Sequence, residues 1–219
     1  MEIKTRKITN TRSLKVIGKF PSLKMNTTVM WESQLERDYI YLLEIDTDIV
    51  AYCEQPFTIA YDRHNRRKKY TPDFLVERKC SKQVVEVKPK SKVESFVKSD
   101  RFLGIRNFCS SNGLEFAIMT EETIRVQPRL DNIKLLYKYS RVDLPWSIYT
   151  DCLNYFQKVK ISTILETDKS LKGRGVTQSS LLKLLWNGFL LTDLMQPISP
   201  HSSIQLSLYA SNWQEEVEA

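Results

Sequence analysis

The segment YTPDFLVERKCSKQVVEVKPK constrains the fold of this chain more than any other part of it. Its two apolar runs, Lys69–Val76 and Gln83–Val87, are rich in valine and aromatic residues. They flank the short polar turn Arg78–Lys82. Two such runs around a short turn predict an antiparallel β-hairpin.

The position of this turn also predicts the register, in which the numbers of opposed residues sum to 159. Opposed residues of a hairpin share a face, with Cβ atoms about 4.5–5.5 Å apart. Asp73 then lies opposite Glu86, and Lys88 shares the face of Glu86 because strand side chains alternate with period two. A slip of one residue would scatter these three groups. The other face is apolar and should pack on helices; its members are Phe74, Val76, Val85 and Val87.

The predicted cluster of Asp73, Glu86 and Lys88 suits metal-assisted chemistry. Two close carboxylates repel, so one would normally be protonated at neutral pH, and a divalent cation removes the conflict. Mg²⁺ prefers carboxylate oxygens and keeps several waters. A lysine beside such a cation can orient an attacking water and stabilise charge that develops at phosphorus. The cluster therefore predicts a site that hydrolyses phosphodiesters.

The segment VMWESQLERDYIYLLEI precedes the hairpin and is predicted to be an amphipathic helix. Apolar residues recur in it at spacings of three and four, and Thr27 or Thr28 is a candidate N-cap. Further elements are expected along the chain. The expected strands are Ile49–Cys53, Phe57–Tyr61, Leu114–Met119 and Thr123–Val126, and the expected helices are 93–112, 130–140, Trp146–Val159 and Ile161–Thr167, with one more that begins near Thr177 and ends at Gly188.

This order of elements predicts two domains after a basic arm. Residues 29–144 should form an α/β domain, a mixed sheet flanked by helices. Residues 145–219 should form a mostly helical domain. There, three helices precede two strand-like runs around Pro197 and Pro200, the order of a winged helix. Residues 1–28 are polar and basic, with a candidate strand around Leu14–Ile17.

The charge of the chain is distributed unevenly. The formal net charge is +7. Residues 151–219 carry six Lys/Arg against seven Asp/Glu, a net charge of −1, whereas residues 1–150 carry 27 against 19, a net charge of +8. A basic surplus favours an anionic partner: nucleic acid, an acidic membrane surface or an acidic protein. The first domain is therefore expected to contact this partner. The second lacks the clustered Lys/Arg that strong phosphate binding needs, which favours docking on protein at least as much as binding to DNA.

Several chemistries are excluded by scarce residues. Only two of the six glycines, Gly173 and Gly175, lie close together, so neither a P-loop nor a dinucleotide-binding loop is expected. Two distant histidines exclude zincin motifs. Four widely spaced cysteines indicate free thiols in a reducing compartment. With neither an apolar signal core nor a membrane span, the chain is expected in the cytosol.

The residues Pro72-Asp73, a twelve-residue gap and Glu86-Val87-Lys88 form the PD-(D/E)xK nuclease signature. Together with SQLERDYIYLLEIDTDIVAYCEQPF and LEFAIMTEE, the chain resembles the TnsA endonucleases of TnsABC-type transposons, including CRISPR-associated ones. The resemblance covers roughly residues 10–219 by layout and is most specific over 33–122. It implies a restriction-endonuclease-like domain followed by a winged helix.

The resemblance also implies roles for individual residues. Glu36 matches the acid of the helix, Asp73 matches the metal-binding aspartate and Lys88 matches the catalytic lysine. Glu86 stands where this family has Gln or Glu. Mg²⁺, for which Mn²⁺ can substitute, would be held by Glu36, Asp73, Glu86 and the Val87 carbonyl.

The resemblance further implies a function in DNA transposition. The chain would cut the 5′ ends of a transposon in double-stranded DNA, while a DDE-type transposase (TnsB-like) cuts and joins the 3′ ends. An AAA+ ATPase regulator (TnsC-like) would bind the C-terminal domain. Two alternatives stay open: another PD-(D/E)xK nuclease, such as a restriction or junction-resolving enzyme, and a non-catalytic DNA-binding adaptor.

Other residues near the motif have less specific interpretations. Glu32 lies four residues before Glu36 and is expected to be solvated or to support the site indirectly, and Gln55 is expected in a turn. His64-Asn65 has no second motif histidine, so a loop is expected there. Six basic residues are candidates for contacts with DNA phosphates: Arg66, Arg67, Lys68, Lys69, Lys90 and Lys92.

Overall fold

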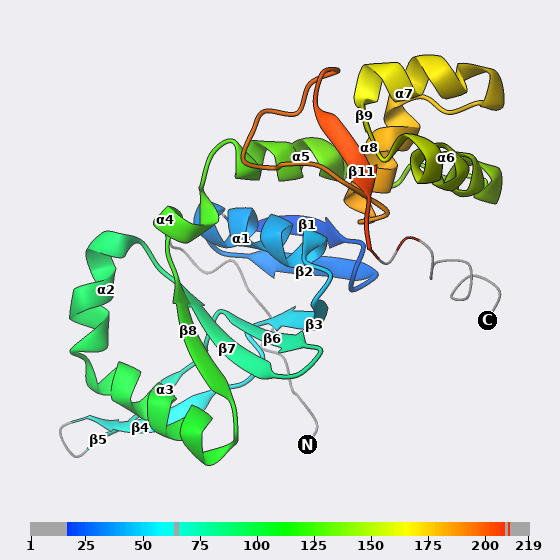
Figure 1. Ribbon diagram of the computed structural model, residues 1–219. Coiled ribbons are helices and arrows are strands. Elements are labelled where there is room, and N and C mark those ends of the chain that lie inside the picture. The colour runs from blue at the N-terminus through cyan, green and yellow to red at the C-terminus, as the bar shows by residue number, and fades with distance from the viewer. Residues whose placement is uncertain (1–16, 64–65, 209, 211–219) are drawn as a thin grey trace. The chain divides into compact units, whose positions relative to one another are not determined.

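The computed structural model describes residues 17–63, 66–208 and 210. The chain divides into two compact units, Met1–Val126 and Gln127–Ala219 (Figure 1). Two features discussed above lie outside the described residues: the first sixteen residues of the arm, with most of the candidate strand Leu14–Ile17, and the dipeptide His64-Asn65. Residues 211–219, with the predicted acidic tail Glu215-Glu216-Val217-Glu218, also lie outside them.

The described part of the predicted arm is a β-hairpin, which corrects the expectation for residues 17–28. Strand β1 (Gly18–Ser22) pairs antiparallel with β2 (Thr27–Trp31). The buried carboxylate of Glu44 holds the turn of this hairpin. It accepts hydrogen bonds from the Ser22 hydroxyl at 2.5 Å, the Leu23 N–H at 2.9 Å and the Tyr52 hydroxyl at 2.6 Å. A buried carboxylate is tolerated where its oxygens are satisfied in this way.

Helix α1 (Gln34–Ile45) begins later than the sequence predicts. Its N-cap is Ser33, whose hydroxyl accepts from the Glu36 N–H, so the expected caps Thr27 and Thr28 are wrong. Those threonines pair in β2 instead, because the hairpin satisfies their backbone groups. The buried side chains Leu35, Tyr39 and Leu43 recur at helical spacing and face the sheet.

A four-stranded sheet carries the motif, in the order β3-β6-β7-β8. Its strands are β3 (Ile49–Glu54), β6 (Phe74–Arg78), β7 (Lys82–Val87) and β8 (Glu115–Met119). Strands β6 and β7 pair antiparallel with Phe74 opposite Val85 and Leu75 opposite Val84, which confirms the register predicted from the turn. Strand β8 runs parallel to β7.

Both faces of the sheet are covered. On one face, Phe74, Val76 and Val85 are buried, and the rings of Tyr39 in α1 and Phe74 meet edge-on at 5.6 Å. This confirms the predicted apolar face. On the other face, Val84 packs in a cluster with residues of α2 (Lys90–Val97) and α3 (Asp100–Ser111), which connect β7 to β8 (Figure 1).

The connection consists of two helices, where the sequence predicted a single helix over 93–112. Helix α2 ends at Val97, with Lys98 as its C-cap. Ser99 then adopts an extended backbone and caps α3 through its hydroxyl, which accepts from the Phe102 N–H. An N-cap serine in the middle of the predicted helix starts a new one. The break turns α3 toward a second hairpin.

This second hairpin also differs from the prediction. Strands β4 (Ile59–Arg63) and β5 (Arg66–Tyr70) pair with each other and form a sheet of their own. The predicted strand Lys69–Val76 is therefore split between β5 and β6. Pro72 lies at the split, and proline lacks the N–H that a continuous central strand needs.

The expected strand Thr123–Val126 is wrong. Its first residues belong to the short helix α4 (Glu121–Ile124), in which the Ile124 N–H donates to the Thr120 carbonyl at 2.9 Å. Ile124 is fully buried. The two acidic residues at the start of α4 favour a helix N-terminus.

The second unit is mostly helical, and its helices follow the predicted order. The expected helix Ile161–Thr167 is wrong at its start, because Ile161–Thr163 form strand β9, which pairs with β11. Its strands pair in the order β10-β11-β9. The elements are α5 (Arg129–Tyr139), α6 (Trp146–Val159), β9 (Ile161–Thr163), α7 (Ile164–Leu171), the short 3₁₀ helix η1 (Lys172–Arg174), α8 (Gln178–Trp186), β10 (Leu190–Leu191) and β11 (Ser203–Leu206).

Helix α5 belongs to this second unit, so the compact division comes earlier than the predicted boundary between residues 144 and 145. The Tyr137 and Trp186 rings meet edge-on at 5.4 Å. The buried Asn132 side-chain amide donates to the Leu194 and Gln196 carbonyls, and its oxygen accepts from the Ile198 N–H. These contacts tie α5 to α8 and to the loop between β10 and β11.

Helix α8 is almost wholly buried within this unit. Six of its nine residues are buried, and the ammonium of Lys183 donates to the Ser140 carbonyl at the end of α5. Burial lowers the pKa of Lys183. Of the helices that the structure describes, none is long and apolar enough to cross a membrane.

Candidate active site

The first part of the site lies where β6 and β7 reach the same edge of the sheet. Asp73 immediately precedes β6, and its carboxylate accepts a 2.7 Å hydrogen bond from the Val87 N–H at the end of β7. The Asp73 carbonyl in turn accepts from the Gln55 N–H at 2.8 Å. The aspartate is therefore fixed between two strands by its backbone and by its side chain.

The surroundings of Asp73 oppose its ionisation. Burial and the negative charge of Glu36 raise the pKa of Asp73 to about 7, against the opposing effects of the Val87 N–H and Lys88. A carboxyl pKa so far above its usual range indicates a place where negative charge is concentrated and incompletely compensated. It also shows that α1 brings Glu36 close to Asp73, although the two are distant in sequence.

Glu86 and Lys88 form the second part of the site. The Lys88 ammonium lies 2.7 Å from Glu86 Oε1, and the carboxyl group of Glu86 is buried. Burial raises the pKa of Glu86, although Lys88 and Arg101 lower it. The other oxygen, Glu86 Oε2, is buried without a hydrogen-bond partner among the described residues. An unsatisfied buried carboxylate oxygen is costly and suits a cation as its partner.

Lys88 is held in place on both sides. The backbone N–H of Lys88 donates to the Met119 carbonyl at 2.9 Å, which continues the pairing of β7 with β8 by one residue. Its ammonium lies 4.6 Å from the centroid of the Phe96 ring, a cation–π contact with α2. The ammonium is thereby fixed next to Glu86 at the end of the strand.

The carboxylate of Glu36 participates in the start of α1. Its oxygens accept from the Glu32 N–H and the Ser33 hydroxyl, each at 2.8 Å. The Gln55 side-chain amide donates to Glu32 at 2.9 Å, so Gln55 is tied to the carboxylates and is more than a turn residue. Gln55 also has a positive φ of 44°. Its place beside the motif could not be read from its position in the sequence.

The donor set fits a hard divalent cation. Asp73 and Glu86 offer carboxylate oxygens, one of which has no partner among the described residues, and Glu36 adds its charge to both groups. Within the described ranges, no three Asp, Glu, His or Cys side chains are grouped closely enough to hold a metal. Glu36 binds the start of α1 and Glu86 binds Lys88, so the metal-ligand set of Glu36, Asp73, Glu86 and Val87 stays a prediction.

The predicted phosphate contacts lie in different surroundings. Strand β5 carries four of them, all exposed: Arg66, Arg67, Lys68 and Lys69. Lys90 begins α2 and pairs with Glu122 at 2.7 Å. Lys92 lines a cleft next to Lys88. The sequence placed all six in one class, whereas the structure puts only Lys92 beside the motif.

This cleft contains basic residues that the sequence analysis missed. Arg63, Lys98 and Arg101 line it together with Lys88 and Lys92. They come from β4, the α2–α3 junction and the first turn of α3. Because these segments are separate in sequence and meet only through packing, no motif or spacing could have identified them together.

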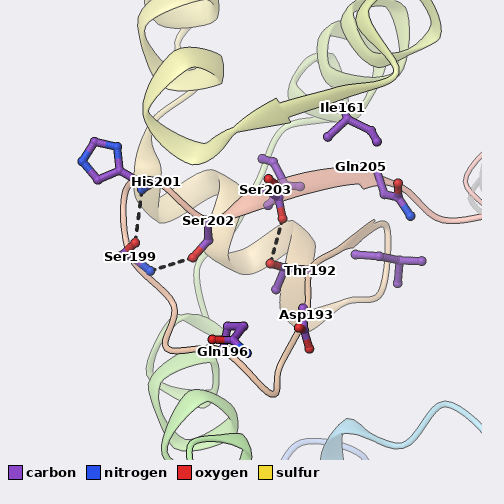
Figure 2. Close-up of a pocket in the computed structure, with 11 residues that line it drawn as sticks. Ile161, Thr192, Asp193, Gln196, Ser199, His201, Ser202, Ser203 and Gln205 are labelled. Carbon is purple, nitrogen blue, oxygen red and sulfur yellow. Dashed lines mark hydrogen bonds between the residues drawn. The ribbon is translucent and has the colours of Figure 1, made fainter.

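A second pocket, of about 730 Å³, lies in the C-terminal unit (Figure 2). It opens over the sheet formed by β9, β10 and β11, and includes the exposed aliphatic side chains Ile161 and Leu191. The Thr192 hydroxyl donates to the Ser203 carbonyl at 2.8 Å across its floor. Apart from Asp193 and His201 the lining is uncharged or aliphatic, so this pocket offers no basic surface to a phosphate.

Comparison with known protein families gives a match for part of the chain. Residues 46–121 match the model of the TnsA-like endonuclease N-terminal domain. The matched segment runs from the end of α1 through β8, so it contains Asp73, Glu86 and Lys88 but ends short of Glu36 on its N-terminal side. No curated protein matches the chain significantly.

Proposed function

From the membership of residues 46–121 in the TnsA-type endonuclease family, we propose that the chain is a Mg²⁺-dependent DNA endonuclease. It cuts the 5′ ends of a transposon as one subunit of a heteromeric transposase. The observation that carries the proposal is the end of β7, where the buried Glu86 contacts Lys88 and the Val87 N–H binds Asp73. Carboxylates and a fixed ammonium at one strand end are what metal-assisted phosphodiester hydrolysis requires.

Glu36, Asp73, Glu86 and the Val87 carbonyl would hold the metal. When bound, Mg²⁺ would supply positive charge to the phosphate and lower the pKa of a water. The unsatisfied Glu86 Oε2 and the raised pKa of Asp73 support this, because both mark negative charge that the chain itself leaves uncompensated. Mn²⁺ is expected to substitute.

Lys88 positions the attacking water in this proposal. Glu86 and the Phe96 ring fix its ammonium, which therefore loses little conformational freedom when substrate binds. The water oxygen bonds to phosphorus and the bond to the 3′ oxygen breaks, which leaves a 3′-hydroxyl and a 5′-phosphate. Lys88 also offsets the negative charge that develops on the phosphoryl oxygens.

The second unit is proposed as a winged-helix domain that docks on protein rather than DNA. Helices α6, α7 and α8, together with a small antiparallel sheet of β9, β10 and β11, support the winged-helix assignment. A DNA-reading helix must expose side chains to the major groove. Helix α8 instead buries six residues and binds Ser140 through Lys183. The AAA+ regulator is the proposed partner here, and the DDE-type transposase acts with the nuclease domain on the same DNA.

Cleavage of transposon-end DNA tests the nuclease proposal. The full chain is incubated with Mg²⁺ and an end-containing duplex, with and without the partner transposase. We expect 5′ nicks from the parent, and loss of at least 100-fold in rate for Asp73→Ala and Lys88→Ala. Lys82→Ala is the matched control, since Lys82 lies at the other end of β7.

Three outcomes of this assay have different meanings. Cleavage of duplexes that lack transposon ends, with no need of the transposase, would favour a restriction-type or junction-resolving nuclease. Unchanged cutting by Asp73→Ala would contradict the proposed site. Binding of DNA without cutting under any condition, together with no uptake of Mn²⁺ in calorimetry, would favour a non-catalytic adaptor.

A further inference from the structure

A basic cleft of about 400 Å³ opens beside Lys88 in the N-terminal unit. We call it the basic cleft and define it by Arg63, Lys88, Lys92, Lys98 and Arg101. Tyr61, Phe96 and Asp100 also line it. Its lining therefore has five cationic side chains and one carboxylate.

The charges in the basic cleft are only partly compensated within the chain. Asp100 lies 3.7 Å from Arg63, and both side chains are more than half exposed, so this pair is weak. Lys98 pairs with Glu94 at 2.5 Å, also in solvent. No ion pair of Lys92 or Arg101 is found among the described residues. Such an excess of positive charge in a concave surface attracts an anion.

Arg101 connects the basic cleft to the carboxylates of the motif. Its guanidinium stacks over the Tyr70 ring of β5 at 5.0 Å, and its charge lowers the pKa of Glu86. A guanidinium held on an aromatic face is oriented before a ligand arrives. Arg101 therefore lies between the second hairpin and the site that holds Glu86 and Lys88.

The walls of the basic cleft are fixed by a close approach of α3 to β4. A Cβ atom at Gly104 would lie 2.5 Å from the Cβ of Tyr61, so only glycine permits this packing without displacement. Gly104 lies one turn after Arg101 in α3, and Tyr61 is itself part of the lining. Gly104 thus allows α3, which carries Arg101, to lie close against β4, which carries Arg63.

We propose that the basic cleft binds the sugar–phosphate backbone of double-stranded DNA next to the phosphate that is cut. Arg63 and Arg101 each contact a different phosphate, and Lys92 continues the track toward Lys88. The inference rests on the proposed function and adds the path of the substrate. Phosphate contacts position a duplex without reading its sequence, which exposed basic side chains around a rigid cleft can do. These contacts also oppose the repulsion of DNA by the three carboxylates.

The salt dependence of DNA affinity tests the proposal. The full chain binds a fluorescent duplex of arbitrary sequence in EDTA, and the association constant is measured from 50 to 250 mM salt. Each lost phosphate contact lowers the magnitude of the logarithmic salt slope by about 0.9. We expect the double variant Arg63→Gln with Arg101→Gln to lower the magnitude of this slope by about 2, and Arg101→Lys to leave the slope unchanged.

A double variant at the far end of the sheet is the matched control. Lys79→Gln with Lys82→Gln removes the same charge at the turn between β6 and β7, and should leave the slope within about 0.3 of the parent, as expected if no phosphate contact is lost. Circular dichroism confirms that each variant is folded. If the control changed the salt slope as much as Arg63→Gln with Arg101→Gln does, net charge, and not the basic cleft, would govern DNA affinity.

Mn²⁺ calorimetry separates the two proposals. The cleft variant is Arg63→Gln with Arg101→Gln. Suppose that it binds DNA with the salt slope of the parent, that the parent binds Mn²⁺ and that Asp73→Ala does not. The cleft proposal is then wrong and the nuclease proposal stands. If the parent binds neither Mn²⁺ nor DNA, both are wrong. A reduced slope in the cleft variant with unchanged Mn²⁺ affinity is the result we expect.

Discussion

At the scale of single residues, Asp73 shows how the fold holds negative charge. Glu36 and burial raise its pKa to about 7, and the Val87 N–H only partly offsets them. The folded chain binds this proton more tightly than the unfolded chain. The resulting stabilisation is full below the usual carboxyl pKa and is lost as pH rises through about 7.

We therefore expect Asp73→Asn to stabilise the metal-free protein at pH 8. The amide removes the repulsion with Glu36 and can still accept from the Val87 N–H. One pKa unit corresponds to about 1.4 kcal/mol, so a gain on the order of 1–2 kcal/mol is expected in urea unfolding. The gain should shrink between pH 7 and pH 5, and Mg²⁺ should stabilise the parent more than the variant. Equal stabilities at pH 8 would contradict the raised pKa.

The cysteines differ in reactivity for similar reasons. Burial raises the pKa of Cys53 and Cys109 to about 11 and that of Cys152 to about 12, whereas Cys80 is exposed in the turn between β6 and β7. Because the thiolate is the nucleophile, buried thiols with raised pKa react slowly.

Labelling with a thiol reagent at pH 8 should therefore show one fast group per native chain. Cys80→Ser should remove this fast phase, and all four thiols should react in urea. Two or more fast thiols in the native parent would show that the units open more readily than their packing indicates.

At the scale of elements, the packing of α3 against β4 is expected to be sensitive to a single added methyl group at Gly104. Alanine favours a helix over glycine by about 1 kcal/mol, but a Cβ at Gly104 would lie 2.5 Å from Tyr61. The cost of displacing Tyr61 should outweigh the gain in helix propensity, since overpacking typically costs about 1–3 kcal/mol.

Gly104→Ala should thus lower the free energy of unfolding by about 1–2 kcal/mol in urea denaturation. Gly173→Ala is the control, because nothing lies within 4 Å of the added Cβ and η1 needs no positive φ there. A stabilised Gly104→Ala variant would mean that α3 and β4 are less tightly packed. DNA affinity measured on the same variant reports whether the walls of the basic cleft have moved.

At the scale of the whole molecule, most of the charge surplus lies in the first compact unit: residues 1–126 carry 23 Lys/Arg against 17 Asp/Glu, a net charge of +6, and residues 127–219 carry 10 against 9, a net charge of +1. The exposed basic side chains of β5 and the basic cleft, which is lined from β4, α2 and α3, belong to that first unit. Helix α8 of the second unit is largely buried. The proposed division of DNA contact and protein docking between the two units therefore rests on packing as well as on charge.

Variants on the exposed face of the second unit test its docking role. Ile161 is 58% exposed and Leu191 is 43% exposed, so Ile161→Asp with Leu191→Asp should change the stability by less than about 1 kcal/mol. Capture of the AAA+ partner should fall at least tenfold, because the buried apolar contacts are replaced by charges. Leu208→Asp, at another exposed aliphatic residue of this unit, is the control. Unchanged capture would place the docking surface elsewhere.

The sequence by itself determined the hairpin of the motif, its register and the approach of Glu86 to Lys88. These are local consequences of a short turn and of alternation with period two. It also predicted most helices of the second unit from their periodicity. Its errors lay where pairing between segments overrides local pattern: at Thr27 and Thr28, which pair in β2, and in 123–126, where α4 buries Ile124.

Only the tertiary structure decided which distant segments contact or influence one another, at the site and in the second unit. Glu36 raises the pKa of Asp73, Arg101 lowers that of Glu86, and α5 covers α8 with Tyr137 against Trp186. Each of these depends on packing between elements that lie far apart in the chain. Periodicity and spacing describe one element at a time, so they can specify the motif but not the surroundings that set its charge.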